Sequence, residues 1–129
     1  MSELTITQAH RDARSQATLD YANLGTAASR IDVYDAAEVL LVTLVLARPA
    51  GVLVDHVIVL QQADATGDLI SVSGTADHAV WVNGNGDVVG SGAVTASDGE
   101  GPFVLAGTAE GSTALYAGGR CLLGVTALG

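Results

Sequence analysis

Residues 74–94, GTADHAVWVNGNGDVVGSGAV, decide the fold that we expect for this chain. Two segments with strand composition, residues 79–82 and 87–94, flank the turn run of residues 83–86, Asn-Gly-Asn-Gly. Because Asn and Gly tolerate the positive φ angles of tight turns, Asn-Gly between apolar runs is a strong β-hairpin signal. Trp81 lies on the first arm and is the only tryptophan, so we expect it in the core. The rest of the chain is predicted to be further sheet, preceded by one helix.

Length and composition indicate one domain with a core of small side chains. Hydrophobic residues make up 49% of the 129 residues, but only five are aromatic, and sixteen residues are glycine. A domain of this length is long enough to bury a core, and the glycines suit many turns. Because this core is modest in volume, it cannot hold all the apolar side chains. We expect some of them to be buried between subunits, in a homodimer or another homo-oligomer.

The charge is strongly acidic. Fourteen aspartates and glutamates stand against five arginines, with no lysine, and the net charge is −9 at pH 7. Such a domain is repelled by phosphate groups. We therefore expect no nucleic acid and no anionic membrane surface among its partners.

Cysteine usage and the apolar runs indicate neither disulfides nor a membrane span. Cys121 is the only cysteine, and beside Leu122 and Leu123 we expect it to be a small buried residue. The N-terminal residues lack the apolar core of a secretory signal. The longest apolar run, residues 39–47, contains Thr43 and is too short to cross a bilayer. The sequence thus predicts a soluble protein made in the cytosol.

Residues 7–24 are the one helical candidate. Thr5 or Thr7 is suited to cap the start, and Gly25 to supply a left-handed residue after the end. The apolar side of this helix is weak because it is mostly alanine, so the helix must lie against the sheet or against another subunit. The residues that we expect on this side are Ala9, Ala13, Ala17 and Leu24, with Leu19 and Tyr21 near them.

The pattern changes to sheet at residue 30. Residues 30–34 alternate between apolar and polar side chains, as in a half-buried strand. Residues 39–47 are almost wholly apolar, so we expect a strand covered on both faces, and a break at residues 48–51. A further strand is predicted at residues 52–60, interrupted by Asp55 and His56. Others are predicted at residues 68–73, 79–82, 87–94, 103–106, 113–116 and 120–128.

Short strands at this spacing, with turn residues between them, are typical of sandwiches and barrels. We predict a mainly β fold, an antiparallel β-sandwich that is jelly-roll-like, with one N-terminal α-helix. The chain then divides into an N-terminal helical arm, residues 1–29, and a β-sandwich domain, residues 30–129.

No pattern in the chain predicts a catalytic, cofactor or metal site. Asn83, Asn85 and Asp87 alternate as the first oxygen ligands of a calcium loop do, but Val88 stands where such a loop needs glycine. Ser91 lies in Gly-Ser-Gly, which lacks the pattern of a nucleophile elbow. We therefore expect no enzyme activity and no cofactor.

Two acid–histidine neighbours, Asp55-His56 and Asp77-His78, are further candidates for chemistry. Adjacent residues of a strand point to opposite faces, so we expect neither pair to form a hydrogen-bonded dyad. Zinc needs a third and a fourth ligand, and the sequence shows none at a suitable spacing. Both histidines are therefore predicted to be solvated or at a sheet edge.

The order of these elements resembles small structural proteins of tailed bacteriophages and prophages, the head decoration (cement) proteins. The resemblance covers nearly the whole chain and rests on turn and strand residues. The segments that carry it are residues 9–24, 30–34, 39–46, 74–81, 82–92 with its Asp-Val-Val-Gly-Ser-Gly run, 103–105 and 122–128.

The resemblance implies a decoration protein that binds the outer face of the phage head and bridges subunits of the shell. Its partners would be the major capsid protein and further copies of this chain, on the outer surface of the virion. The contact residues that we expect are Arg11 and Arg14 on the helix, and Val39 and Leu41 on the apolar strand.

A second hypothesis is a receptor-binding or carbohydrate-binding module of a phage tail. Trp81 or Tyr116 would then have to be exposed as a platform for stacking. The core is the favoured place for Trp81, since a lone tryptophan is generally heavily buried.

Overall fold

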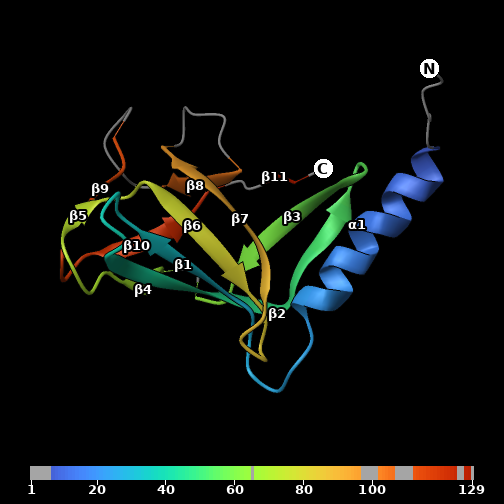
Figure 1. The fold of residues 1–129 in the computed structure, drawn as a ribbon, viewed down its shortest axis with the longest axis horizontal. Coiled ribbons are helices and arrows are strands. Elements are labelled where there is room, and N and C mark those ends of the chain that lie inside the picture. Colours follow the sequence, from blue (N-terminus) through green and yellow to red (C-terminus); the bar gives the residue numbers. More distant parts are fainter. Residues whose placement is uncertain (1–6, 65, 97–101, 107–111, 125–126, 129) are drawn as a thin grey trace.

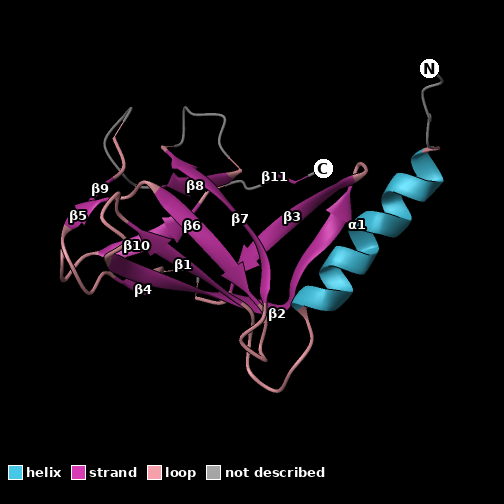
Figure 2. Cartoon of the chain, viewed as in Figure 1, coloured by secondary structure: helices cyan, strands magenta, loops and turns pink. Residues whose placement is uncertain are grey.

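The computed structural model describes residues 7–64, 66–96, 102–106, 112–124 and 127–128. In these residues, one helix, α1 (Gln8–Ala22), packs beside a large curled sheet (Figure 1, Figure 2). This confirms the predicted mainly β, β-sandwich-like fold with one N-terminal helix. The strands are β1 (Arg30–Tyr34), β2 (Leu40–Val54), β3 (Val57–Gln62), β4 (Asp68–Leu69), β5 (Gly74–Thr75), β6 (His78–Val82), β7 (Val88–Thr95), β8 (Phe103–Ala106), β9 (Ala114–Leu115), β10 (Arg120–Leu123) and β11 (Ala127–Leu128).

Nine of the described strands form one sheet that curls around a common core. Its order is β11-β3-β2-β1-β6-β7-β8-β10-β4, and all neighbours are antiparallel except the parallel pair β7–β8. The two ends of the sheet approach each other. The N–H of Ser71, just after β4, donates to Leu41 O on β2 at 2.9 Å. The side-chain amide of Gln62 on β3 donates to Cys121 O on β10 at 3.0 Å.

Helix α1 begins and ends close to the predicted positions. Thr7 Oγ1 accepts a hydrogen bond from the N–H of His10 at 3.1 Å, which caps the first turn. After the last turn, the N–H of Asn23 donates to Leu19 O at 3.0 Å, and Gly25 has a φ of +96°. The capping residues thus confirm the predicted start and end of the helix.

The side of α1 that packs on the sheet is not the alanine side. Leu19 and Ala22 are buried in the core. A polar contact supports this rotation, because the Asp12 carboxylate lies 3.0 Å from Nδ1 of His56 in the turn after β2. The prediction is confirmed for Leu19 and was wrong for five residues that are exposed: Ala9, Ala13, Ala17, Tyr21 and Leu24.

The hairpin β6–β7 is confirmed together with its turn. Asn83 is fully buried, and its Oδ1 accepts hydrogen bonds from the N–H groups of Asn85 and Asp87, both at 3.0 Å. Trp81 is also buried, and its Nε1 donates to Ser29 Oγ at 2.7 Å. The predicted core position of Trp81 is therefore confirmed, and the only hydrogen-bond donor of its ring has a partner.

The turn of this hairpin docks on the segment that follows α1. The N–H of Gly84 donates to Leu24 O at 3.0 Å, and Nδ2 of Asn83 donates to Tyr21 O at 3.1 Å. The two backbones approach so closely that a Cβ on Gly25 would lie 2.6 Å from the carbonyl carbon of Gly84. Glycine at both positions makes this contact possible.

The predicted break at residues 48–51 is a bulge within one continuous strand. The pairing of β2 with β3 passes from Leu46–Gln62 directly to Gly51–Leu60, so the residues between them bulge out. The Arg48 guanidinium donates three hydrogen bonds to the carbonyl groups of residues 25–27. Arg48 thereby ties the bulge to the link after α1.

A hairpin turn lies where Asp55 and His56 interrupt the strand predicted at residues 52–60. Asp55 and His56 have φ angles of 49° and 73°, and they form a two-residue turn between β2 and β3. Such turns need positive φ at both central residues and usually contain glycine or asparagine. Aspartate and histidine adopt this conformation less often, so the sequence pattern did not predict the turn.

The first half of β2 is covered on one face only. Leu44 and Leu46 are fully buried, whereas Leu40 and Val45 are 42% and 38% exposed. The prediction that residues 39–47 are covered on both faces was therefore wrong.

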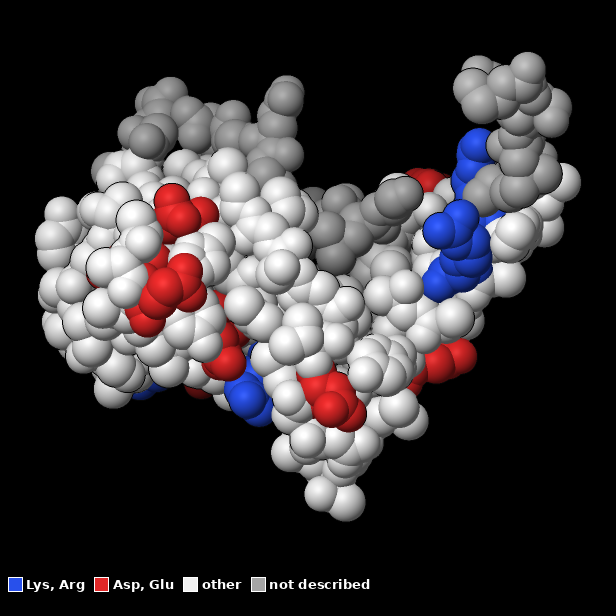
Figure 3. Space-filling view, viewed as in Figure 1, with Lys and Arg blue, Asp and Glu red and all other residues white. Residues whose placement is uncertain are grey.

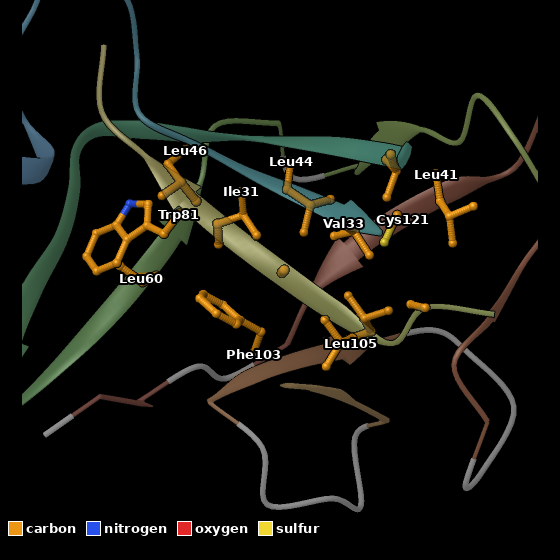
Figure 4. Packing of buried hydrophobic residues seen from close by; sticks show 14 of the residues in the cluster. Ile31, Val33, Leu41, Leu44, Leu46, Leu60, Trp81, Phe103, Leu105 and Cys121 are labelled. Atoms are coloured by element: carbon orange, nitrogen blue, oxygen red, sulfur yellow. The ribbon is translucent and has the colours of Figure 1, made fainter. Parts of the chain in front are cut away.

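The inner face of the sheet carries the core. Ile31 of β1 pairs with Leu44 on one side and with Trp81 on the other, so the three side chains share one face. Figure 4 shows them together with Phe103 and Leu105 from β8, which close the core from the opposite side. The core therefore joins strands that lie far apart in the sequence.

The later strands are present, but most are short. Residues 103–106 form β8 as predicted, whereas the strands predicted at residues 68–73 and 113–116 shrink to the two-residue strands β4 and β9. Residues 120–128 contribute β10 and β11.

Gly84→Ala should destabilise the fold. A Cβ on residue 84 would lie 2.1 Å from Ala27 O and 2.9 Å from Leu24 O, and both are backbone atoms. We expect the free energy of unfolding to fall by about 1–3 kcal/mol, as overpacking generally causes, measured by urea denaturation. Gly90→Ala is the matched control, because its Cβ would meet nothing within 4 Å. Equal stability of the two variants would contradict the docking of the turn.

Candidate interaction surface

The two acid–histidine pairs have different partners in the structure. His56 bonds to Asp12 of α1 rather than to the neighbouring Asp55. His78 does bond to its neighbour, with Nδ1 at 2.9 Å from Asp77 Oδ2. The prediction that neither pair forms a dyad was therefore wrong for the second pair. Asp77 precedes β6, so the alternation of a strand does not direct its side chain away from His78.

The described residues contain no group of three or more His, Cys, Asp or Glu side chains arranged to hold a metal ion. The calcium candidates are explained by the hairpin turn, because Asn83 Oδ1 already accepts two backbone hydrogen bonds from Asn85 and Asp87. Asn83 is also fully buried. Its oxygen therefore shapes the turn.

Cys121 is a buried thiol on β10. Burial raises its pKa to about 11, and the negative charge of Asp68 adds to this shift. The thiol therefore stays protonated at neutral pH, where a thiolate would be the reactive form. The expected role as a small buried residue is confirmed.

An exposed apolar strip follows the first half of β2 and the segment beside it. Its five members are Val39, Leu40, Val45, Leu69 and Val72. Leu69 is the most exposed of them, at 55%. We call these residues the apolar strip.

Hydrogen bonds hold the two segments of the strip side by side. The N–H groups of Ser71 and Val72 donate to Leu41 O at 2.9 and 3.3 Å. The N–H of Val45 donates to Asp68 Oδ2 at 3.0 Å. The two segments that carry the strip therefore lie side by side, and exposed apolar surface is typical of protein-binding sites.

The strip ends at an acidic corner formed by Asp35, Glu38 and Asp77. Asp35 shapes the turn between β1 and β2, because its Oδ1 accepts the N–H groups of Ala37 and Val39, both at 2.9 Å. Glu38 and Asp77 both bond to the ring of His78. The corner gives the strip a polar margin at the end where β2 begins.

Of the contact residues expected from the sequence, Val39 is exposed and belongs to the strip, but Leu41 is fully buried. Leu41 therefore cannot make the expected contact, and the prediction was wrong for this residue. The pairing of β1 with β2 shifts register between Val33 and Tyr34, which leaves both Leu41 and the following residue on the inner face. Leu40 takes the outward position.

Arg11 and Arg14 are exposed on α1, and among the described residues their side chains make no hydrogen bond or ion pair. The helix packs on the second half of β2, where Asn23 Oδ1 accepts the N–H of Ala50 at 2.9 Å. The strip lies on the first half of β2. The two expected contact regions are therefore separate surfaces.

The space-filling view shows basic groups on the helix and carboxylates spread over the rest of this face, with some beside the helix (Figure 3). The other three arginines are engaged: Arg30 pairs with Asp32, while Arg48 and Arg120 donate to backbone carbonyl groups.

Tyr116 is exposed, at 72%, in contrast to the buried Trp81. The next residue, Ala117, donates its N–H to Ser73 Oγ at 2.8 Å, which places Tyr116 near the Val72 end of the strip. Of the two residues considered as a stacking platform, only Tyr116 presents its ring to solvent.

Comparison with models of known protein families, with curated protein sequences and with solved structures finds no match to this chain. Among the described residues, no helix has both the length and the apolar character that a bilayer crossing requires.

Cys121 should be unreactive in the folded protein. Because its pKa is raised to about 11 and its side chain is buried, little thiolate is available at neutral pH. We expect a thiol-reactive disulfide reagent to modify the native protein about 100-fold more slowly than the protein unfolded in urea. Equal rates in the two states would show that Cys121 is not protected by the fold.

Proposed function

We propose that this chain is a decoration protein of a bacteriophage head, which binds the outer face of the capsid and bridges major capsid subunits without catalysing a reaction. The observation that carries the proposal is the apolar strip, which stays exposed beside a well-packed core. A partner protein would bury these side chains and gain the free energy of their transfer from water. The resemblance to head decoration proteins suggests which partner this is.

The negative net charge supports binding to the outer face of the capsid. A domain with a net charge of −9 is repelled by packaged DNA. Arg11 and Arg14 offer a second, weaker contact on another surface of the molecule. Two separate surfaces suit a protein that bridges neighbouring subunits, because weak contacts are multiplied when many sites are occupied together. Copies of this chain, as a homodimer or another homo-oligomer, are the second proposed partner.

A tail-associated receptor-binding or carbohydrate-binding module is the other candidate function, and the exposed ring of Tyr116 favours it. An exposed aromatic ring offers an apolar face and a polar hydroxyl to a sugar. In this alternative, Tyr116→Ala abolishes binding to glycans of the host surface, whereas changes in the strip have little effect.

The first test is the copy number of this chain in purified virions, measured by quantitative mass spectrometry against the major capsid protein. We expect a number comparable with that of the major capsid protein, because decoration follows the whole head lattice. A few copies per particle would contradict decoration and favour the tail module. Absence from the particle would contradict both proposals.

The second test changes the strip itself. Leu40→Asp should weaken binding to heads that lack this chain by about tenfold or more, because a charge replaces an apolar contact residue. Val54→Asp is the matched control, since Val54 is equally exposed on β2 but lies outside the strip. Thermal unfolding of both variants checks that each is folded. Unchanged binding of the Leu40 variant would contradict the role of the strip.

A further inference from the structure

His78, at the start of β6, lies between two carboxylates. Its Nδ1 is 2.9 Å from Asp77 Oδ2, and its Nε2 is 2.9 Å from Glu38 Oε1. The ring stacks on Tyr34 of β1, with the ring centroids 5.6 Å apart and an interplanar angle of 15°. Both ring nitrogens are therefore engaged, by groups from two different segments.

Only the protonated ring can donate to both carboxylates. A neutral imidazole has one N–H donor and one nitrogen with only a lone pair. That second nitrogen would face a carboxylate oxygen with no hydrogen atom between them. The hydrogen bond to Asp77 is the main cause that raises the pKa of His78, and the bond to Glu38 adds to it. The cluster therefore keeps the ring charged to a higher pH than the ordinary value of 6.5 allows.

The ionisable groups around His78 come from three segments. Tyr34 faces it from β1, Asp77 from the residue before β6, and Glu38 from the turn between β1 and β2. Asp35 belongs to the same turn but uses its Oδ1 for backbone N–H groups. The strand on the other side, β7, places the uncharged Ala93 opposite His78.

The two carboxylates are not held equally. Asp77 is the chain neighbour of His78, whereas Glu38 reaches it from an exposed turn. Glu38 has a φ of 66°, a conformation that is uncommon for residues other than glycine. The side-chain bond to His78 therefore links a strained turn to the sheet, and Glu38 is the partner that leaves when the second donor is lost.

We propose that Asp77, His78 and Glu38 form a pH-sensitive clamp that holds the β1–β2 turn against the sheet. The protonated ring holds Glu38, and loss of the proton releases Glu38 together with the turn that leads into Val39 and Leu40. The pKa of His78 is higher in the folded state than in the unfolded state. The stabilisation is therefore complete below the unfolded-state pKa and is lost as the pH rises through the folded-state pKa. This inference does not rest on the proposed function, since it concerns the isolated protein.

The test follows ring protonation and the turn in the same sample by NMR. We expect the His78 ring to titrate above the value of a histidine in an unstructured peptide. Across that titration, the amides of Glu38 and Val39 should lose protection from hydrogen exchange on the order of tenfold, beyond the intrinsic effect of pH. Residues 83–87 are the internal reference, because that turn contains no histidine. Constant protection of Glu38 and Val39 would overturn the proposal.

Two variants separate the clamp from a general effect of pH. Glu38→Gln keeps the shape of an exposed side chain, and it should lower the pKa of His78 and weaken the response of the turn. His78→Gln should abolish that response. His56→Gln is the matched control, since His56 lies in a different turn, and it should leave the response unchanged. A response that persists in His78→Gln, or disappears in His56→Gln, would overturn the clamp.

Discussion

A single buried amide, that of Asn83, joins the hairpin to the helix. Its oxygen accepts the N–H groups of Asn85 and Asp87, and its nitrogen donates to Tyr21 O at the end of α1. A buried amide without partners would be costly, so these bonds specify the turn and the position of the helix end together. Aspartate would keep the acceptor and lose the donor, which explains why asparagine suits this place.

A second set of hydrogen bonds, around Ser29, joins this region to the core. The Trp81 ring donates to Ser29 Oγ, and the Ser29 hydroxyl donates to Val82 O at 2.9 Å. Arg48 binds the carbonyl groups of residues 25–27 from the other side. The helix is thereby held beside the second half of β2.

The strip and the His78 cluster meet at the turn between β1 and β2. Val39 and Leu40 follow Glu38 directly in the sequence, so a change in the turn acts on one end of the strip. The turn carries negative charge, and the protonated ring of His78 neutralises part of it. The two proposals therefore concern neighbouring parts of one face of the molecule.

The sequence by itself determined the helix, the β6–β7 hairpin and the buried position of Trp81. These features depend on neighbours in the chain: a capping threonine, the Asn-Gly turn and the alternation of apolar side chains. Exposure of Val39 is also consistent with the sequence prediction of a contact residue.

Only the tertiary structure decided which side of α1 is buried, which of Leu40 and Leu41 faces solvent, and which carboxylates surround His78. The rotation of α1 follows from contacts with the β2–β3 hairpin, and the position of Leu41 follows from a shift in pairing with β1. Glu38 and His78 are brought together by β1, which pairs with both β2 and β6. Local propensity carries no information about such contacts, because they join residues that are distant in the sequence and depend on the register of the sheet.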